Sequence, residues 1–205
     1  MRYGEKALIG LVLCVAVAGL ALPALAADEG WVPLLNGKDL SNWENARDAK
    51  AANNWTLDDG AMTNDITKKN DIASKDKFKD FDLKIEYKTV KAGNSGVYLR
   101  GRIEIQVLDS FGKQPGNGED GAIYGQFAPK VVASKAAGEW NTLEVSCKGD
   151  KVSAKLNGQV IHDNQQVAKV TGGAQPGGVD EAGPIMLQGD HGKVWYRNIM
   201  IKPAK

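Results

Sequence analysis

Two neighbouring segments within residues 93–109 carry the side chains best suited to chemistry. Both alternate apolar and polar residues at the two-residue period of a strand, so Tyr98 and Arg100 share one face. Glu104 and Gln106 share a face for the same reason. Exposed sheet faces normally carry Lys, Thr and Ser, whereas this one offers a fixed cation, a proton acceptor, an amide and a ring. We expect it to bind a polyhydroxylated ligand.

Glu104, Gln106 and Asp109 form the pattern Glu-x-Gln-x-x-Asp. Glu104 and Gln106 are expected to contact the ligand, and a surface ion pair or sheet-face ladder is the alternative. Asp109 is also taken as a ligand contact, although it points to the other face unless a bulge intervenes. The pattern is similar to the Glu-x-Asp-x-x-Glu signature of retaining glucanases, with Gln106 where a carboxylate would stand. This difference weakens an interpretation as an ordinary glycosidase.

His191 is the strongest proton-transfer candidate outside these segments. Gly189 and Gly192 predict a tight turn that presents Asp190 and His191, and imidazole is well tuned for proton transfer near neutral pH. The alternatives are a structural hydrogen bond or ligation of a divalent cation, although two ligands do not make a metal site. The other histidine, His162, is expected to lie on the surface.

Three further side chains complete the expected site. Arg100 is expected to donate to sugar oxygens, with an ion pair to Glu104 or Asp109 as the alternative. Asn94 lies between glycines and either contacts the ligand or only forms a turn. Tyr124 ends a long glycine-rich segment and either stacks on a sugar or is buried.

Short segments of strand period, separated by turn residues, predict the elements that position these groups. Asn157-Gly158 between two such segments is a strong hairpin signal. The chain is therefore expected to form an all-β, antiparallel jelly-roll sandwich. The expected strands are 54–57, 81–90, 96–100, 102–108, 140–148, 151–156, 159–163, 183–188 and 194–202.

Only residues 65–77 and 130–137 leave room for helical turns, and neither is convincingly amphipathic. Two long glycine-rich connections, 112–125 and 171–183, are expected to be functional or mobile. Cys147 alternates with apolar neighbours and is expected to be a buried core residue. The five tryptophans are expected in the core or at its edges.

The first 26 residues have the features of a secretory signal. Arg2 and Lys6 precede an apolar run, and Ala24-Leu25-Ala26 forms a small-x-small cleavage site. We expect a single mature domain over residues 27–205, periplasmic or secreted, without membrane insertion once the signal is cleaved. The chain has 26 basic and 25 acidic residues, so neither nucleic acid nor an anionic membrane surface is an expected partner.

Five ordered sequence blocks, within residues 31–43, 81–83, 93–100, 104–109 and 183–199, together resemble the DUF1080 family, also called the 3-keto-disaccharide hydrolase domain. The match spans essentially the whole mature chain, and Gly189 adds one residue compared with a shorter Leu-Gln-Asp-His form. The resemblance adds Gln188 to the expected substrate contacts. The blocks are Trp31–Leu40 with Trp43, Phe81–Leu83, Gly93–Gly96 with Arg100, Glu104–Asp109, and Gly183–Gln188 continuing through Asp190-His191-Gly192 to Arg197–Ile199.

The resemblance implies a concanavalin-A-like sandwich that degrades glycosides oxidised to a ketone at carbon 3. A separate sugar 3-dehydrogenase would supply this substrate. The ketone acidifies the hydrogen on carbon 2, so a base can start elimination of the glycosidic oxygen, after which water adds. Such an enzyme needs a base and an enolate donor, here His191, Glu104 and Arg100. A noncatalytic carbohydrate-binding module and a conventional glucanase-like glycosidase are the alternatives.

Overall fold

Alternating burial along the strands shows how this sequence builds its sheets. In β6 (Phe81–Thr89), every second residue is buried and the residues between are half-buried. β9 (Asn141–Lys148) buries residues at the same period. Each strand therefore turns its apolar side toward a core and its charged side toward solvent, as the period predicts.

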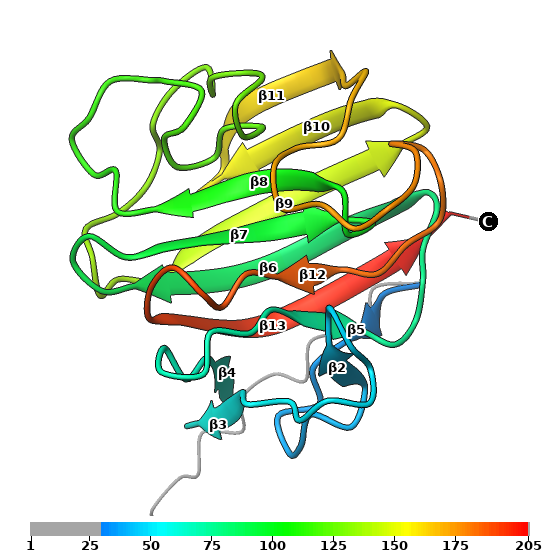
Figure 1. Ribbon diagram of the computed structural model, residues 1–205. Helices are drawn as coiled ribbons and strands as arrows, with labels where there is room; N and C mark the ends of the chain where they lie inside the picture. The colour runs from blue at the N-terminus through cyan, green and yellow to red at the C-terminus, as the bar shows by residue number, and fades with distance from the viewer. Residues whose placement is uncertain (1–29, 205) are drawn as a thin grey trace, which may run out of the picture.

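The computed structural model describes residues 30–204, which form two antiparallel sheets in two layers without any helix (Figure 1). The larger sheet has the order β11 (Gln159–Gln166), β10 (Lys151–Leu156), β9, β6, β13 (Val194–Pro203), β4 (Ala61–Thr63) and β3 (Thr56–Asp58), and β1 (Val32–Pro33) also pairs with β13. The smaller sheet has the order β2 (Trp43–Asn45), β5 (Ile72–Ser74), β12 (Met186–Leu187), β7 (Asn94–Leu99) and β8 (Ile103–Leu108).

Both sheets contain neighbours that are distant in sequence. β6 pairs with β9 and β13, and β12 pairs with β5 and β7. The inward side chains form one apolar cluster between the layers, and Cys147 belongs to it, with its pKa raised to about 11 by burial. The all-β jelly-roll prediction is confirmed, and so is the burial of Cys147.

The predicted hairpin forms between β10 and β11. Asn157 and Gly158 have φ angles of 50° and 80°, the left-handed conformation that a two-residue turn of this hand requires. Most predicted strands differ from the observed ones by a few residues. The segment expected as a strand over 183–188 pairs as a strand only at Met186–Leu187. Residues 65–77 contain one turn, closed by the Lys68 N–H and the Asp65 carbonyl, followed by β5.

His162 is buried rather than exposed, which corrects the sequence prediction. The β10–β11 register pairs Lys155 with Val160 but Ala154 with His162, so Ile161 is an extra residue in the ladder. This irregularity buries both Ile161 and His162. The Nε2 atom of His162 lies 2.8 Å from the carbonyl oxygen of Gly121, and burial lowers the pKa of the ring.

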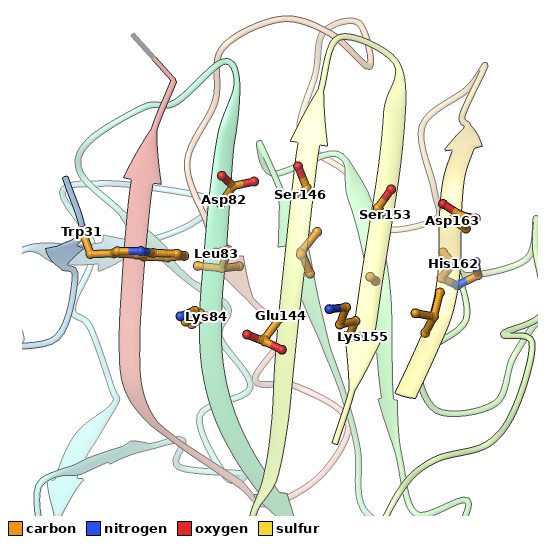
Figure 2. A pocket seen from close by; sticks show the side chains of 13 residues that line it. Trp31, Asp82, Leu83, Lys84, Glu144, Ser146, Ser153, Lys155, His162 and Asp163 are labelled. Atoms are coloured by element: carbon orange, nitrogen blue, oxygen red, sulfur yellow. The ribbon is translucent and has the colours of Figure 1, made fainter. Parts of the chain in front are cut away.

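The outer face of the larger sheet carries a shallow hollow of about 260 Å³ (Figure 2). Its side chains come from β6, β9, β10 and β11, with Trp31 at one end and Asp163 at the other. Lys84 lies 4.7 Å above the Trp31 ring. Trp31, Trp140 and Trp195 are half-buried, whereas Trp43 and Trp55 are core residues. The tryptophans therefore lie in the core or at its edges, as predicted.

Arg100 does not share the face of Tyr98, contrary to the sequence prediction. β7 ends at Leu99, and Arg100 and Gly101 have φ angles of 55° and 68° that turn the chain into β8. The strand alternation therefore stops before Arg100, whose fully buried side chain packs elsewhere. Its guanidinium donates to the carbonyls of Lys79, Gly149 and Val179 and to the carboxylate of Asp80.

The predicted signal and cleavage site within residues 1–27 lie outside the described residues, so the expected export stays a prediction. Within residues 30–204, no helix is long and apolar enough to span a bilayer.

Replacement of Arg100 should therefore unfold the protein more readily than a surface replacement. Arg100→Met removes a donor from each of three carbonyl groups and leaves the Asp80 carboxylate with only the N–H of Gly149. We expect a loss of about 3 kcal/mol in the free energy of unfolding. The half-exposed Arg197, which pairs with Glu86, is the control, and Arg197→Met should cost about 1 kcal/mol or less. Urea denaturation measures both values, and equal losses would contradict the structural role of Arg100.

Candidate active site

A hollow of about 250 Å³ lies on the outer face of the smaller sheet. Eight residues expected at the site from the sequence line it: Asn94, Tyr98, Glu104, Gln106, Tyr124, Gln188, Asp190 and His191. Four lining residues were not expected: Arg47, Asp71, Gly172 and Gly173. The polar face of β7 and β8 is therefore the floor of one hollow, with loops forming its walls.

The register between β7 and β8 sets the floor. Tyr98 pairs with Glu104, and Gly96 pairs with Gln106. A Cβ atom on Gly96 would lie 2.8 Å from Cγ of Glu104, closer than side chains tolerate. Glycine at position 96 therefore gives the Glu104 side chain the space that it occupies over β7.

Glu104 is a buried carboxyl group poised to exchange a proton. Only 3% of the residue is exposed, and burial raises its pKa to about 7. A hydrogen bond with Tyr98 and the nearby charge of His191 oppose this rise, while Asp71 and Asp190 add to it. Near neutral pH, both the acid and the carboxylate forms of Glu104 are therefore populated.

Tyr98 connects the floor to the wall formed by residues 171–173. Its hydroxyl donates to the carbonyl of Gly172 at 2.8 Å, and the backbone N–H of Glu104 donates to Oγ1 of Thr171 at 3.0 Å. Burial and the neighbouring Glu104 raise the pKa of Tyr98 well above its usual range. Tyr98 is therefore a neutral hydroxyl at physiological pH.

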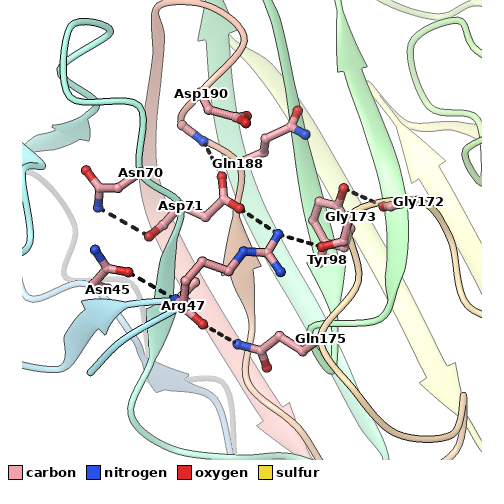
Figure 3. Close-up of polar contacts among 12 residues, drawn as sticks. Asn45, Arg47, Asn70, Asp71, Tyr98, Gly172, Gly173, Gln175, Gln188 and Asp190 are labelled. Carbon is pink, nitrogen blue, oxygen red and sulfur yellow. Dashed lines mark hydrogen bonds and ion pairs between the residues drawn. The ribbon is translucent and has the colours of Figure 1, made fainter. Parts of the chain in front are cut away.

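An Arg47–Asp71 ion pair forms another wall (Figure 3). The Nη2 atom of Arg47 donates to Oδ2 of Asp71 at 3.0 Å and to the carbonyl of Gly173 at 2.7 Å. Asp71 is buried, whereas the Arg47 side chain is half-exposed. These residues flank the three-residue strands β2 and β5, which are too short for a periodic signal, so no sequence pattern pointed to them.

The turn that carries His191 is held from both sides. Asn64 donates through Nδ2 to the carbonyls of Gly189 and Gly192, at 2.8 and 2.7 Å. The N–H of Gly189 donates to Oδ1 of Asp71 at 3.0 Å. A Cβ atom on Gly189 would collide with Trp55 and the Asn70 backbone. The residue added at position 189 is therefore a packed anchor for the turn.

His191 and Asp190 form a hydrogen-bonded pair at the mouth of the hollow. The Nδ1 atom of His191 is bonded to Oδ1 of Asp190, and both side chains are partly exposed. This bond orients the ring and leaves Nε2 available for a ligand.

Amide groups and one ring complete the lining. Gln106 donates through Nε2 to Oδ1 of Asn94 at 3.2 Å. Gln188 is fixed through its backbone, which donates to the carbonyl of Gly96 and accepts from the hydroxyl of Ser95. Tyr124 is 41% exposed, so its ring is accessible at the rim for stacking on a sugar.

Asp109 lies outside this hollow, contrary to the sequence prediction. Its Oδ2 accepts the N–H of Ala92 at 2.9 Å, and its own N–H donates to the carbonyl of Gly93. Asp109 therefore braces the turn that precedes β7, and β8 ends before it at Leu108. The Glu-x-Gln-x-x-Asp pattern does not bring a second carboxylate next to Glu104.

Within residues 30–204, no three histidine, cysteine or acidic side chains gather in a way that could hold a metal ion. Asp190 and His191 are two potential ligands, and two ligands do not make a metal site.

Comparisons with known proteins match nearly all of the described chain. The sequence profile of a family described as the 3-keto-alpha-glucoside-1,2-lyase-like domain matches residues 30–202. A 3-keto-disaccharide hydrolase from Bacteroides thetaiotaomicron is 26% identical over 238 residues, which cover 89% of this chain and 81% of the relative.

Solved structures agree with this match. A candidate glycosyl hydrolase from Parabacteroides distasonis superposes with a TM-score of 0.72 at 32% identity, covering 86% of this chain and 84% of its own. The β-glucanase of Bacillus licheniformis has a TM-score of 0.53 at 15% identity, covering 85% and 97%. At that identity the glucanase shows only a shared fold, which is the predicted sandwich.

The raised pKa of Glu104 can be measured directly. We expect its carboxyl carbon to titrate near pH 7 in carbon-13 NMR, with the signal assigned by its loss in Glu104→Gln. Tyr98→Phe removes a hydrogen bond that favours the carboxylate, so the pKa of Glu104 should rise further. A titration near pH 4 in the parent protein would contradict the desolvated environment described here.

Proposed function

The chain belongs to the 3-keto-alpha-glucoside-1,2-lyase-like family, and from this premise we propose that it cleaves 3-keto-glycosides by elimination followed by hydration. Its family and its relatives make it a carbohydrate-active enzyme of the glycoside hydrolase type. The observation that carries the finer proposal is Glu104, a buried carboxyl group whose pKa is raised to about 7 at the floor of the hollow.

Glu104 acts as the base in this proposal. Its carboxylate takes the hydrogen on carbon 2 that the carbon 3 ketone acidifies, and the electrons of that C–H bond form an enolate with its charge on the ketone oxygen. A base with a pKa near the working pH is the most effective for such a transfer. The neutral Tyr98 hydroxyl lies beside Glu104, and its one proton can turn from the Gly172 carbonyl to the carboxylate.

Arg47 takes the role of enolate donor that the sequence suggested for Arg100. Both hydrogen bonds of the Arg47 side chain within residues 30–204 start from Nη2, so Nη1 and Nε remain for a ligand. Asp71 fixes the guanidinium beforehand, and fixed donors aimed at developing charge lower the barrier without reorganisation.

His191 assists the leaving group. When the enolate electrons return, a double bond forms between carbons 1 and 2, the bond from carbon 1 to the glycosidic oxygen breaks, and that oxygen takes a proton. The Nε2 of His191, oriented by Asp190, supplies this proton and then accepts one from the water that adds to carbon 1. This addition forms the enolate again, and Glu104 returns to carbon 2 the proton that it took. The products are a free alcohol and a 3-keto sugar.

The arrangement of carboxylates favours elimination over direct displacement. A retaining glycosidase needs two carboxyl groups about 5 Å apart that act as acid and nucleophile. Asp71 is occupied by Arg47 and Gly189, Asp190 is bonded to the ring of His191, and Asp109 lies outside the hollow. Glu104 is thus left without the partner carboxylate that the displacement mechanism uses.

Supply of the substrate requires oxidation at carbon 3 of a glycoside by a separate sugar 3-dehydrogenase. We propose that both steps belong to one exported route of oligosaccharide breakdown, in the periplasm or outside the cell. The secretory features of residues 1–26 support this location.

The ketone requirement gives the first functional prediction. The protein should release glucose units from 3-keto-maltose and none from maltose, because only the ketone makes the carbon 2 hydrogen acidic. Deuterium at carbon 2 should slow kcat/KM, whereas deuterium at carbon 5 should not. Equal cleavage of maltose would support a conventional glycosidase, and binding of both sugars without turnover would support a binding module.

The pH profile should separate the base from the other groups. Because Glu104 must be ionised, kcat/KM should fall as the pH decreases through about 7. Glu104→Gln and His191→Ala should each lower kcat/KM by roughly 10²-fold or more, but the residual activity of Glu104→Gln should lose this limb while that of His191→Ala should keep it. Near-normal cleavage by both variants would show that these residues are assigned wrongly even though the family is right.

A further inference from the structure

A second cavity, of about 250 Å³, lies beside the active-site hollow and shares Arg47 with it. The segment that follows Thr171 connects the two, since Gly173 lines the first and Gln175 lines the second. Two residues of chain span at most about 7 Å, a distance that one glycosidic linkage can cover. In Figure 3, Arg47 lies between Asp71 and Gln175. A ligand that reaches over Arg47 would occupy both cavities.

The charge of this second cavity is one-sided. Arg47, Lys77 and Arg102 line it, and no acidic residue does. Arg102 is already engaged, because Nε donates to the carbonyl of Pro176 at 2.9 Å and Nη1 to that of Glu181 at 3.0 Å. Lys77 is exposed, and its ammonium group has no hydrogen-bond or ion-pair partner within residues 30–204. The cavity therefore has a free cation for a ligand group.

We infer that this cavity is a subsite for a carboxylate on the sugar that leaves, so that acidic glycosides are preferred substrates. The inference rests on the proposed function, because it assumes that the reacting 3-keto sugar lies over Glu104. Nη2 of Arg47 is occupied by Asp71 and Gly173, so Nε remains for the enolate oxygen and Nη1 can donate one hydrogen bond to the carboxylate. Lys77 adds the charge that favours a carboxylate over a neutral group. A phosphate dianion would need more free cations than the cavity provides, since Arg102 is engaged by carbonyl groups through Nε and Nη1 and lies 3.8 Å from the Glu181 carboxylate through Nη2.

Two substrates that differ only in the terminal group test this subsite. 3-Keto-maltobionate carries a carboxylate on an open-chain leaving unit, and 3-keto-maltitol carries a hydroxymethyl group there. We expect kcat/KM for the acidic substrate to be roughly fivefold higher, with the preference shrinking as salt is added. Lys77→Met should remove the preference. Lys75→Met, a neighbouring exposed lysine that does not line the cavity, should retain it.

Equal kcat/KM values in the parent protein, or the same preference in Lys77→Met, would overturn the subsite and leave the proposed function intact. Calorimetry with unoxidised maltobionate and maltitol measures binding without turnover, so it tests the subsite independently of the proposed reaction. If neither keto substrate is cleaved, the proposed function fails, and a binding preference for maltobionate that depends on Lys77 would still support the subsite. Equal binding of the two sugars would overturn it.

Discussion

The antiparallel register between β7 and β8 is the constraint on which this site depends. One face of the pair supplies apolar side chains such as Val97 and Ile105 to the core between the sheets, and both are fully buried. A slip by one residue would move the whole apolar set to the wrong face, so packing fixes the register strongly. The same register necessarily places Tyr98 opposite Glu104 on the other face. Core packing therefore positions the groups that the proposed chemistry uses.

Burial of two acidic side chains, Glu104 and Asp71, determines how this site can handle protons. Glu104 is buried by the segment around Thr171 and by β7, and its pKa rises because the carboxylate loses water. Asp71 is also buried, yet it accepts from the Gly189 N–H and from Arg47. The two acids differ in how many donors replace the water that they lose. Asp71 accepts hydrogen bonds from two donors and has a structural role, whereas Glu104 remains free to exchange a proton. Two of the three carboxyl groups that line the hollow thereby take different roles.

The function of a sandwich of this kind depends on the side chains of its site, because many proteins share the fold. The β-glucanase neighbour shares the fold at 15% identity, and fold alone does not fix an activity. In this chain, Gln106 lies where the glucanase signature has a carboxylate, and Asp109 braces a turn instead of entering the hollow. The polar set that remains, with Arg47 and His191 around one raised-pKa acid, suits proton abstraction beside a ketone.

The sequence by itself determined the class of fold and most of the floor of the site, because strand alternation is a local property of neighbouring residues. Tyr98, Glu104 and Gln106 could be placed on one face from spacing alone. The tertiary structure alone decided the positions of Arg47 and Asp71. These residues flank two short strands and are held by bonds to Gly173 and Gly189, over a hundred residues away. It also decided that Arg100 leaves the site and that His162 is buried, since one left-handed turn and one ladder irregularity interrupt the alternation. Such interruptions depend on long-range packing and hydrogen bonds that no local pattern records.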